Sequence, residues 1–277
     1  MNATVNQHRS FHHEDAPYTL PNDAPEWKRL DDMHEGIDAY LGHRLSYAPV
    51  DQNVKRILEI GCGSGAWATQ AARTYPDATV TAIDISEPPP RRLPENVVFQ
   101  KVNVAETLPF EPESFDLIHA RFVFVHLPDW EAILQRVITL LRSGGWLLIE
   151  DLNHVFLSDN DGIGPGIQKF QDVIREYNAH RNVDSFVGSK LERTLRNTSQ
   201  FSEVNVVEVK CRFDGDSEDP NTSGIGQTMR ESFRKAYQAL DPKLGVTPEV
   251  QAEFYKEFDD PGRNIYLKIY MTWSRKK

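Results

Sequence analysis

The sequence has very little cysteine, no long apolar run and no secretory leader. Cys62 and Cys211 are its two cysteines, too few for a disulfide framework, which favours a reducing compartment. No apolar run approaches the roughly 18 residues of a membrane span. The first 15 residues are polar and contain histidine, unlike the apolar stretch of a secretory signal. We therefore expect a cytoplasmic protein without a membrane segment.

Positive charge is also scarce. The 31 Lys and Arg residues are outnumbered by 41 Asp and Glu residues, which gives a net charge of −10 and a pI of about 5.4. Phosphate binding needs clustered positive charge, so nucleic acid and anionic membrane are not expected partners. With 277 residues, of which 39% are hydrophobic, the chain is long enough to bury a full core. These properties are typical of a soluble globular protein.

Strand-like and helix-like segments alternate through the first half of the chain. An Ala-rich helix is predicted at residues 66–75, and a second helix is predicted to start at its cap, Asp129, and to end at Gly144-Gly145. Apolar, β-branched strands are predicted at residues 54–60, 79–85, 97–102, 115–120 and 145–150. Strand, helix and strand at this spacing predict parallel pairing through right-handed crossovers, and hence a doubly wound α/β sheet.

Helical patterns dominate the two flanks of this alternation. An apolar face recurs every three or four residues from Trp27 to Leu41, which predicts an N-terminal helix. Aromatic residues are frequent after residue 151; most are expected to be core residues at helical spacing, and some, among a set that includes Phe233 and Tyr237, are alternatively candidates to line an apolar acceptor site. Downstream, helices are predicted within 162–198, 227–240 and 248–258, strands at 204–213 and 265–273, and a polar loop at 214–226.

The organisation predicted from these segments is one domain with insertions. The late helices are expected to cover the carboxyl ends of the strands, where open α/β sheets bind their ligands. The predicted parts are a disordered tail at 1–16 and a domain at 17–277, divided into an N-terminal helical cap (17–50), a cofactor-binding core (54–151) and helical substrate or lid segments (152–200 and 214–262).

A glycine-rich bend follows the first predicted strand. Gly61, Gly63 and Gly65 precede a helix, where glycine permits a tight turn and the helix N-terminus offers free N–H donors. Asp84 follows Gly65 by 19 residues, close to the roughly 20-residue offset at which a carboxylate binds a ribose diol. The bend and the carboxylate together predict a nucleoside-containing cofactor, rather than three turn glycines and a surface acid.

Two cofactor classes fit this pattern. Gly61, Gly63 and Ala66 satisfy the dinucleotide spacing Gly-x-Gly-x-x-Ala. Glu59, however, lies just before the bend, where its carboxylate would repel a pyrophosphate and attract a cationic amino group. The chain after the fifth strand also lacks the second βαβαβ half of a dinucleotide site. A nucleoside that carries an amino group is favoured, with a dinucleotide as the alternative.

Four segments of the core occur in the order and spacing of a known motif set. Residues 54–65, Asp84, residues 115–121 and residues 141–151 resemble the motifs of class I S-adenosylmethionine-dependent methyltransferases. The segment from residue 18 to residue 34 is further similar to fungal secondary-metabolism methyltransferases, a group that includes relatives of the velvet-complex regulator. The resemblance implies a mostly parallel, seven-stranded Rossmann-like sheet that binds S-adenosylmethionine. It also implies methyl transfer to an O, N or S nucleophile of a small molecule, a secondary metabolite.

The resemblance implies a role for each residue around the bend. Glu59 would bind the ammonium of the methionine part, directly or through water, and Asp84 would accept both ribose hydroxyls. Gly61 and Gly63 would let the backbone pass beside the cofactor. The other implied contacts are Ile85, Asn103 and Val104 at the adenine, Ala120 and Arg121 beside the methionyl chain, and Tyr18 and Arg29 over the cofactor carboxylate. The prolines at 88–90 are expected to shorten the helix after the second strand.

Three histidines lie on or after the carboxyl ends of the fourth and fifth strands. Methyl transfer is an in-line displacement that mainly needs alignment in a dry pocket, and it needs a base where the nucleophile arrives protonated. His154, and after it His126, are the expected bases. His119 lies within a strand and is expected to be structural.

Several interpretations stay open. Asp151, Asp159 and Asp161 follow the fifth strand, but no calcium-loop spacing accompanies them, so no metal site is expected. The chain is alternatively a cofactor-binding regulator without turnover, a dinucleotide-dependent oxidoreductase, or an enzyme that uses the sulfonium charge for a non-methyl reaction. The acceptor is not identified, and a homodimer or a regulatory protein partner stays open.

Overall fold

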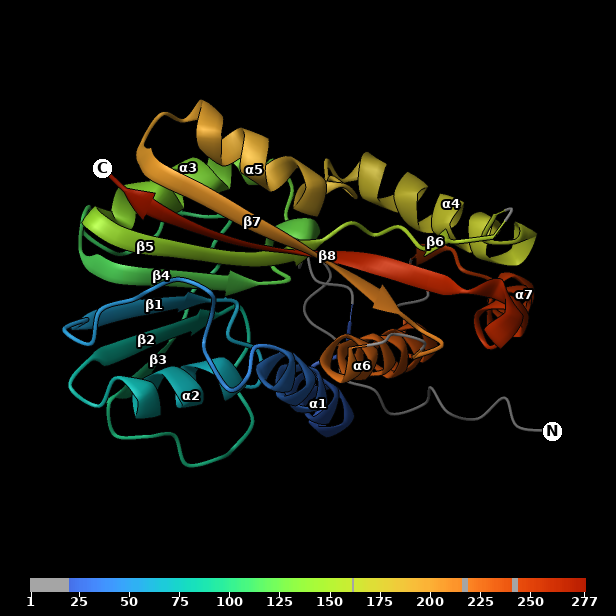
Figure 1. Cartoon of the computed structure of the whole chain (residues 1–277), viewed down its shortest axis with the longest axis horizontal. Helices are drawn as coiled ribbons and strands as arrows, with labels where there is room; N and C mark the ends of the chain where they lie inside the picture. The colour runs from blue at the N-terminus through green and yellow to red at the C-terminus, as the bar shows by residue number, and fades with distance from the viewer. Residues whose placement is uncertain (1–19, 161, 216–218, 241–243) are drawn as a thin grey trace.

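Apolar segments of the first half of the chain form the parallel part of a central sheet (Figure 1). The structure, a computed structural model, describes residues 20–160, 162–215, 219–240 and 244–277; the predicted tail at 1–16 and Tyr18 lie outside this description. Parallel pairing gives the order β3-β2-β1-β4-β5. The bounds are β1 (Arg56–Ile60), β2 (Thr79–Asp84), β3 (Val97–Lys101), β4 (Phe115–Arg121) and β5 (Leu141–Leu152).

A long reversed strand, β8 (Ile265–Lys276), joins the rest of the sheet to this parallel part. It pairs antiparallel with β5, with β7 (Phe201–Arg212) and with the two-residue β6 (Leu157–Ser158). Among the described residues the sheet therefore has eight strands, all but β8 running in one direction, instead of the seven predicted. The additional strand, β6, is too short to produce an alternating pattern in the sequence.

Helices cover both faces of the sheet, which confirms the predicted doubly wound α/β fold (Figure 1). α2 (Ala66–Thr74) packs Trp67 and Ala68 against Ile57 of β1 and Leu117 of β4. α3 (Trp130–Leu140) and α5 (Val187–Asn197) cover the opposite face. β1 and β4 are buried almost throughout because both of their faces are covered.

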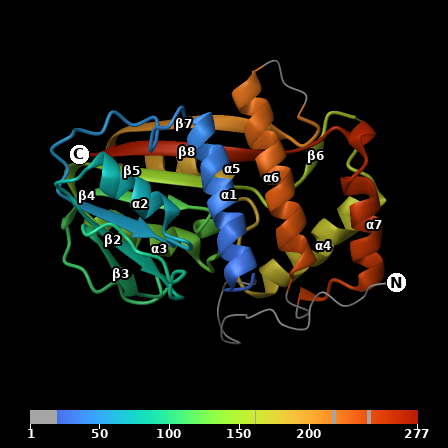
Figure 2. The same cartoon turned by 90° about the horizontal axis from the view of Figure 1, so that it is seen from below.

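Two long helices, α1 (Ala24–Tyr40) and α6 (Pro220–Gln238), lie side by side beyond the carboxyl ends of the parallel strands (Figures 1 and 2). The N-cap of α1 is Asp23, whose side chain accepts the Glu26 N–H at 3.1 Å. Gly36 of α1 faces Thr228 of α6, and a Cβ at Gly36 would lie 2.4 Å from the Thr228 Oγ1. A glycine here therefore permits the close approach of the two helices.

An aromatic cluster fills the space between the later helices and β7. α4 (Pro165–His180) packs on α7 (Pro248–Phe258), whose bounds match the prediction. Phe156 lies at the centre of the cluster, in ring contact with Phe213, Phe233, Tyr237, Phe254 and Phe258. Most of the downstream aromatic residues are therefore core residues, as their spacing predicts.

The end of α3 differs from the prediction. The helix ends at Leu140 instead of at Gly144-Gly145, and β5 begins at the next residue. The reason is sheet pairing, because Leu141 is already opposite Phe115 of β4, before the register shifts at a bulge. The helical apolar spacing extends to Leu141, so the sequence places the end of the helix at the glycines that follow, inside the strand.

Of two predicted helix starts, one is confirmed and one is wrong. α3 begins directly after Asp129, as predicted, but Asp129 has a left-handed φ of 47° and its carboxylate accepts a hydrogen bond from Asn182 Nδ2 instead of one from a backbone N–H of the helix. α6 begins at Pro220 rather than at residue 227, inside the predicted polar loop. Its N-cap is Asp219, whose side chain accepts from two backbone N–H groups of the first turn. Glycines in the first half of α6 weaken its helical sequence pattern, so the sequence did not predict that half as a helix.

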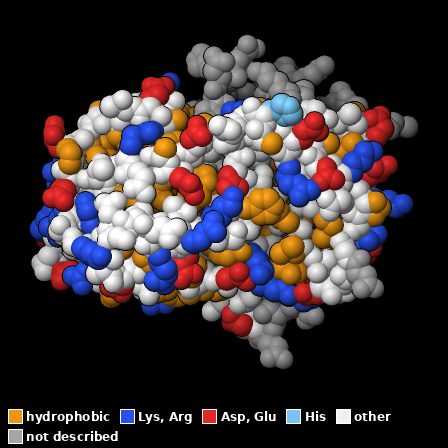
Figure 3. Space-filling view, turned by 90° about the horizontal axis from the view of Figure 1, so that it is seen from above, with side chains coloured by type: hydrophobic (Ala, Val, Ile, Leu, Met, Phe, Trp, Pro, Cys, Tyr) orange, Lys and Arg blue, Asp and Glu red, His pale blue; other side chains and the backbone are white. Residues whose placement is uncertain are grey.

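Charged side chains of both signs are interspersed on the face that carries α3, α4 and α5 (Figure 3). Arg196 and Glu192 of α5, for example, pair one turn apart at 2.8 Å. Within the part of the chain that the structure describes, no helix combines the length and the apolar composition of a bilayer span.

Two glycines of α6 provide a matched test of its packing on β7. A Cβ at Gly226 would lie 2.1 Å from the Arg212 carbonyl oxygen, whereas a Cβ at Gly224 would meet no described atom within 4 Å. We expect Gly226→Ala to lower the free energy of unfolding by about 1–3 kcal/mol, because the backbone must shift. Gly224→Ala should raise it by about 0.5–1 kcal/mol. Urea denaturation followed by circular dichroism measures both, and equal effects would contradict this packing.

Candidate functional site

A cavity opens at the carboxyl ends of the parallel strands, beneath α1 and α6. Gly61 after β1, Asp84 at the end of β2, Arg121 at the end of β4 and Leu152 at the end of β5 all line it. Its volume of about 210 Å³ is far larger than the roughly 10–15 Å³ that one water molecule needs. The cavity therefore has room for an organic ligand at the place where open α/β sheets bind them.

The glycine bend forms the floor of the cavity. Gly61 and Gly63 have φ values of +66° and +52°, a left-handed conformation that favours glycine. A Cβ at Gly61 would also lie 2.5 Å from Cγ2 of Val123, so the bend and the chain after β4 are in close contact. Both predicted glycines line the cavity.

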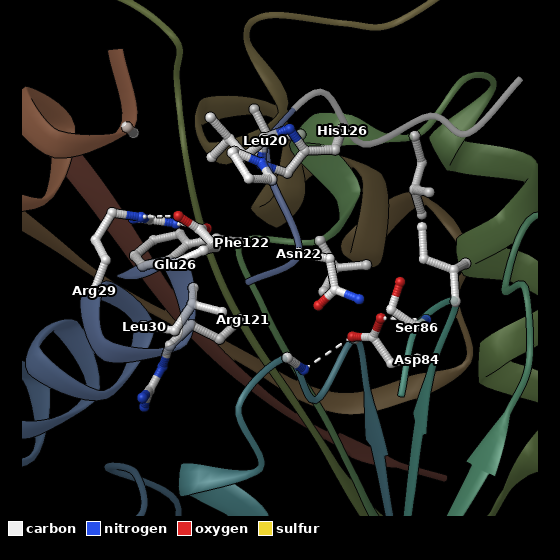
Figure 4. Close-up of a pocket in the computed structure, with 18 of the residues that line it drawn as sticks. Leu20, Asn22, Glu26, Arg29, Leu30, Asp84, Ser86, Arg121, Phe122 and His126 are labelled. Atoms are coloured by element: carbon white, nitrogen blue, oxygen red, sulfur yellow. Dashed lines mark hydrogen bonds and ion pairs between the residues drawn. The ribbon is translucent and has the colours of Figure 1, made fainter. Parts of the chain in front are cut away.

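Asp84 is bound to the bend by its side chain. Its Oδ2 accepts the Gly63 N–H at 2.8 Å and its Oδ1 accepts the Ser86 N–H at 3.0 Å (Figure 4). The half-buried carboxylate is thus held in a defined orientation at the cavity wall, and a carboxylate is the kind of acceptor that a diol requires.

The chain after β2 and β3 forms one edge of the cavity. Ile85, Asn103 and Val104 line it, as predicted for residues near an adenine. The Asn103 side chain is engaged locally, because its Nδ2 donates to Glu106 Oε1 at 3.0 Å and its Oδ1 accepts the Ala105 N–H at 3.1 Å. Its oxygen and nitrogen are therefore held in a defined orientation.

Arg29 reaches the cavity as half of a buried ion pair. Its Nε and Nη2 donate to the two carboxylate oxygens of Glu26 at 2.8 and 2.6 Å, and its Nη1 donates to Ser232 Oγ of α6 at 2.6 Å. Figure 4 shows the pair at the wall of the cavity. Removing one member of such a pair would leave an uncompensated buried charge. The sequence singles out Arg29 but gives no signal for its bidentate partner.

Arg121 links β4 to β5 and α1. Its Nε donates to Glu150, and its Nη1 lies 3.1 Å from Nδ1 of His34. Burial, together with the adjacent guanidinium, lowers the pKa of His34 to about 4. The imidazole is therefore neutral near pH 7 and can accept from the guanidinium.

Glu59 and Ala120 do not line the cavity, within the described part of the chain. Glu59 points to the α2 face of the sheet, where it lies beside His119, whose ring stacks on Trp67 at 3.7 Å. Burial raises the pKa of the Glu59 carboxyl to about 8, with Arg121 opposing the shift and Asp84 adding to it. Its Oε2 has no hydrogen-bond partner among the described residues.

His126 and His154 line the cavity with their rings 5.3 Å apart. Burial lowers the pKa of His154 to about 4. Burial, with His154 and two arginines adding to the effect, also lowers the pKa of His126 well below its usual range. Both imidazoles are therefore neutral near pH 7, which is the state in which an imidazole can accept a proton. Nδ1 of His154 is buried without a hydrogen-bond partner in the described structure.

The rest of the wall comes from α4 and α6, which lie in the two segments predicted to form the helical substrate or lid part. α4 supplies Ile174 and Asn178, and α6 supplies Met229, Phe233 and Tyr237. These side chains make the half of the cavity beside the histidines largely apolar. Their spacing in the sequence is that of ordinary core residues, so no sequence signal distinguishes them from the core.

The acidic residues after β5 have structural partners. The Asp151 carboxylate accepts backbone N–H groups, and Asp159 pairs with Lys210 and Arg212 at 2.6 Å each. Asp161 lies outside the described residues.

Comparisons with known proteins agree with the motif set. A family model described as a methyltransferase domain matches residues 32–198. Methyltransferase str2 of Strobilurus tenacellus is 43% identical over 94% of this chain and 96% of that protein. Secondary metabolism regulator laeA of Aspergillus fumigatus is 29% identical over 71% of this chain and 54% of that protein.

A solved structure with the same fold is phosphoethanolamine N-methyltransferase 2 of Haemonchus contortus in complex with S-adenosyl-L-methionine. It is 17% identical, with a TM-score of 0.54, over 88% of this chain and 53% of that chain. The family model spans the glycine bend, Asp84 and both candidate histidines, and the match to str2 extends over nearly all of both proteins. The chain therefore belongs to the methyltransferase family.

Proposed function

We propose that this chain transfers the methyl group of S-adenosylmethionine to an O, N or S nucleophile of a small, largely apolar secondary metabolite. One observation carries the proposal. A single cavity joins the glycine bend and the Asp84 carboxylate to an apolar half that holds two neutral imidazoles, His126 and His154. A cofactor and an acceptor can therefore meet in one enclosed space, as in-line transfer requires.

The strand ends form the half of the cavity proposed for the cofactor. Asp84 would accept the ribose hydroxyls, and its bond to Gly63 holds it in place for that purpose. Ile85, Asn103 and Val104 would contact the adenine. When bound, the cofactor supplies a methyl group on a positively charged sulfur. Placing that charge in a dry site favours transfer, because charge is dispersed as the methyl leaves.

The methionine part would lie toward α1 and β4. Arg29 and Arg121 line this side, each already paired with a glutamate. Glu59 lies behind the bend, so we propose that it acts on the cofactor ammonium through water rather than directly. Its orphaned Oε2 supports this role, because a cation nearby would favour the charged carboxylate. Ala120 would only pack beneath this part, and Tyr18, outside the described residues, keeps its predicted role over the carboxylate.

The apolar half of the cavity is proposed for the acceptor. Met229, Phe233 and Tyr237 of α6 would contact its apolar body. His154 or His126 would remove the proton of a nucleophile that arrives protonated, as hydroxyls and many amines do. This is the one proton that the chain itself must move in the proposed reaction.

Two rival functions make different demands on the same cavity. A dinucleotide-dependent oxidoreductase would need a second βαβαβ half beyond β5, whereas the neighbour of β5 in the sheet is the antiparallel strand β8. A regulator without turnover is favoured by one observation, the similarity to laeA. The regulator would bind the cofactor equally well, so the two are distinguished by product formation when labelled cofactor is given with a metabolite extract.

Replacement of Asp84 tests the cofactor half. Asp84→Ala should weaken S-adenosylhomocysteine binding by at least tenfold, because each hydrogen bond to a charged group contributes about 1.5–3 kcal/mol. The control is Asp77→Ala, whose carboxylate is 82% exposed beside Lys55. Isothermal calorimetry measures both variants, with NAD as a second ligand. Unchanged affinity in Asp84→Ala, or tight binding of NAD alone, would contradict the proposal.

Replacement of the two imidazoles tests the acceptor half. The double variant His126→Gln/His154→Gln, and the single variant of whichever histidine acts as the base, should lower transfer of labelled methyl into a metabolite extract by about 10²-fold or more, the range of general-base catalysis. The affinity for S-adenosylhomocysteine should stay within about twofold. Full transfer by the double variant would exclude both histidines as bases.

The buried carboxyl of Glu59 predicts a pH dependence of stability. Its pKa is about 8 in the folded chain and 4.5 as a free side chain, so between these values the folded state holds a proton that the unfolded state has released. Stability is therefore lost as pH rises through this window, by at most about 1.4 kcal/mol per pH unit. Glu59→Gln should gain stability relative to the parent protein between pH 5 and pH 8. Urea denaturation at both pH values measures the difference between Glu59→Gln and the parent protein, and a difference that stays constant would contradict the raised pKa.

A further inference from the structure

The chain after β4 forms a wall of the cavity in a conformation that is unusual for its residues. Phe122 and His126, both labelled in Figure 4, line the cavity together with Val123 and Val125. Phe122 has a φ of +53°, a left-handed conformation that is uncommon for a bulky residue. Such a conformation costs about 1–3 kcal/mol and persists only where surrounding contacts enforce it. Contacts with neighbouring residues must therefore hold Phe122 and the rest of the wall in this conformation.

A buried carboxylate lies behind this wall. Asp151, near the end of β5, is 0% exposed, and its Oδ2 accepts the Val125 N–H at 3.2 Å. Its Oδ1 accepts the Leu152 N–H at 2.9 Å. Burial raises the pKa of this carboxyl to about 7, and the N–H groups of Val123 and Phe124 are among those that oppose the shift. Three successive backbone N–H groups of the wall thus favour the charged form of one carboxylate.

The wall in turn contacts the glycine bend. Cγ2 of Val123 lies 2.5 Å from the position that a Cβ at Gly61 would occupy, so the Val123 side chain packs on Gly61 in space that only glycine leaves open. The Phe122 N–H also donates to the Glu150 carbonyl at 2.8 Å, one residue before Asp151. A displacement of the wall would therefore move the surface on which the cofactor is proposed to lie.

We infer that Asp151 is a positioning residue, whose carboxylate holds residues 122–126 against Gly61 and so fixes the wall shared by the cofactor and acceptor halves of the cavity. The inference rests on the proposed function only where it names the cofactor and the acceptor as the ligands. The position of the backbone at residues 122–126 does not depend on those ligands and can be measured without them. Asp151 itself does not line the cavity, within the described residues, so it acts through the wall.

A second buried carboxylate at the opposite end of the sheet provides the matched control. Asp116 accepts the N–H groups of Lys55 and Arg56 at 2.6 and 2.8 Å, at the start of β1. It is 7% exposed and, like Asp151, accepts two backbone N–H groups through its carboxylate, which also pairs with Arg142 at 2.6 Å. Both variants, Asp151→Asn and Asp116→Asn, place an amide against backbone donors, and both should destabilise the fold.

The test is amide hydrogen exchange of the ligand-free full chain, followed by calorimetry with S-adenosylhomocysteine. Asp151→Asn should accelerate exchange at Val123, Phe124 and Val125 by about 5- to 100-fold, the equivalent of leaving one buried donor unpaired. It should weaken S-adenosylhomocysteine binding by about fivefold or more. Asp116→Asn should accelerate exchange only around Lys55 and Arg56 and leave the affinity unchanged.

Two outcomes would overturn the inference. Exchange at residues 123–125 that is unchanged in Asp151→Asn, or equally accelerated in Asp116→Asn, would show a general structural role. If the parent protein fails to bind S-adenosylhomocysteine, the proposed function fails while the exchange data still test the positioning role. Should Asp151→Asn not fold, Val123→Ala keeps the carboxylate and removes the contact with Gly61; parental affinity in that variant would contradict the inference.

Discussion

The hydrogen bond from the Gly63 N–H to the Asp84 carboxylate, 2.8 Å long, is the interaction on which the site depends. It joins the bend after β1 to the tip of the neighbouring strand β2, and it is possible because a left-handed Gly63 turns its N–H toward that strand. The bond fixes the rotamer of a half-buried carboxylate at the cavity wall. With the hydrogen bond from the Ser86 N–H to the other carboxylate oxygen, it gives the cavity an oriented acceptor for a diol.

The parallel half of the sheet was predictable because local pattern and tertiary environment agree there. β1 and β4 are covered on both faces, so apolar residues predominate in their sequences on both sides of the strand, and each is bounded by glycine or polar residues. Predictions failed where pairing decided the structure. Leu141 belongs to β5 because Phe115 lies opposite it, and β6 exists only through its pairing with β8. No local pattern in the sequence shows which strand will pair with a given segment.

In the site, too, the residues that follow from local sequence and strand order were predicted, and those that depend on pairing between distant segments were not. Asp84 and the glycine bend follow from topology, because the carboxyl ends of neighbouring parallel strands meet at one edge. The pairing of Arg29 with Ser232 joins residues 203 positions apart, and the helical wall of α4 and α6 depends on how those helices dock. Glu59 was predicted at the cofactor, yet strand alternation turns its side chain toward α2, beside His119. The register of β1 and β4, rather than residue type, decided that outcome.

The structure of the complex with S-adenosylhomocysteine tests the central claim most directly. The account predicts the adenosyl group in the cavity at the carboxyl ends of β1 and β2, with both ribose hydroxyls within hydrogen-bond distance of the Asp84 carboxylate. The account would be contradicted by a ribose that lies away from Asp84, or by a ligand bound outside this cavity.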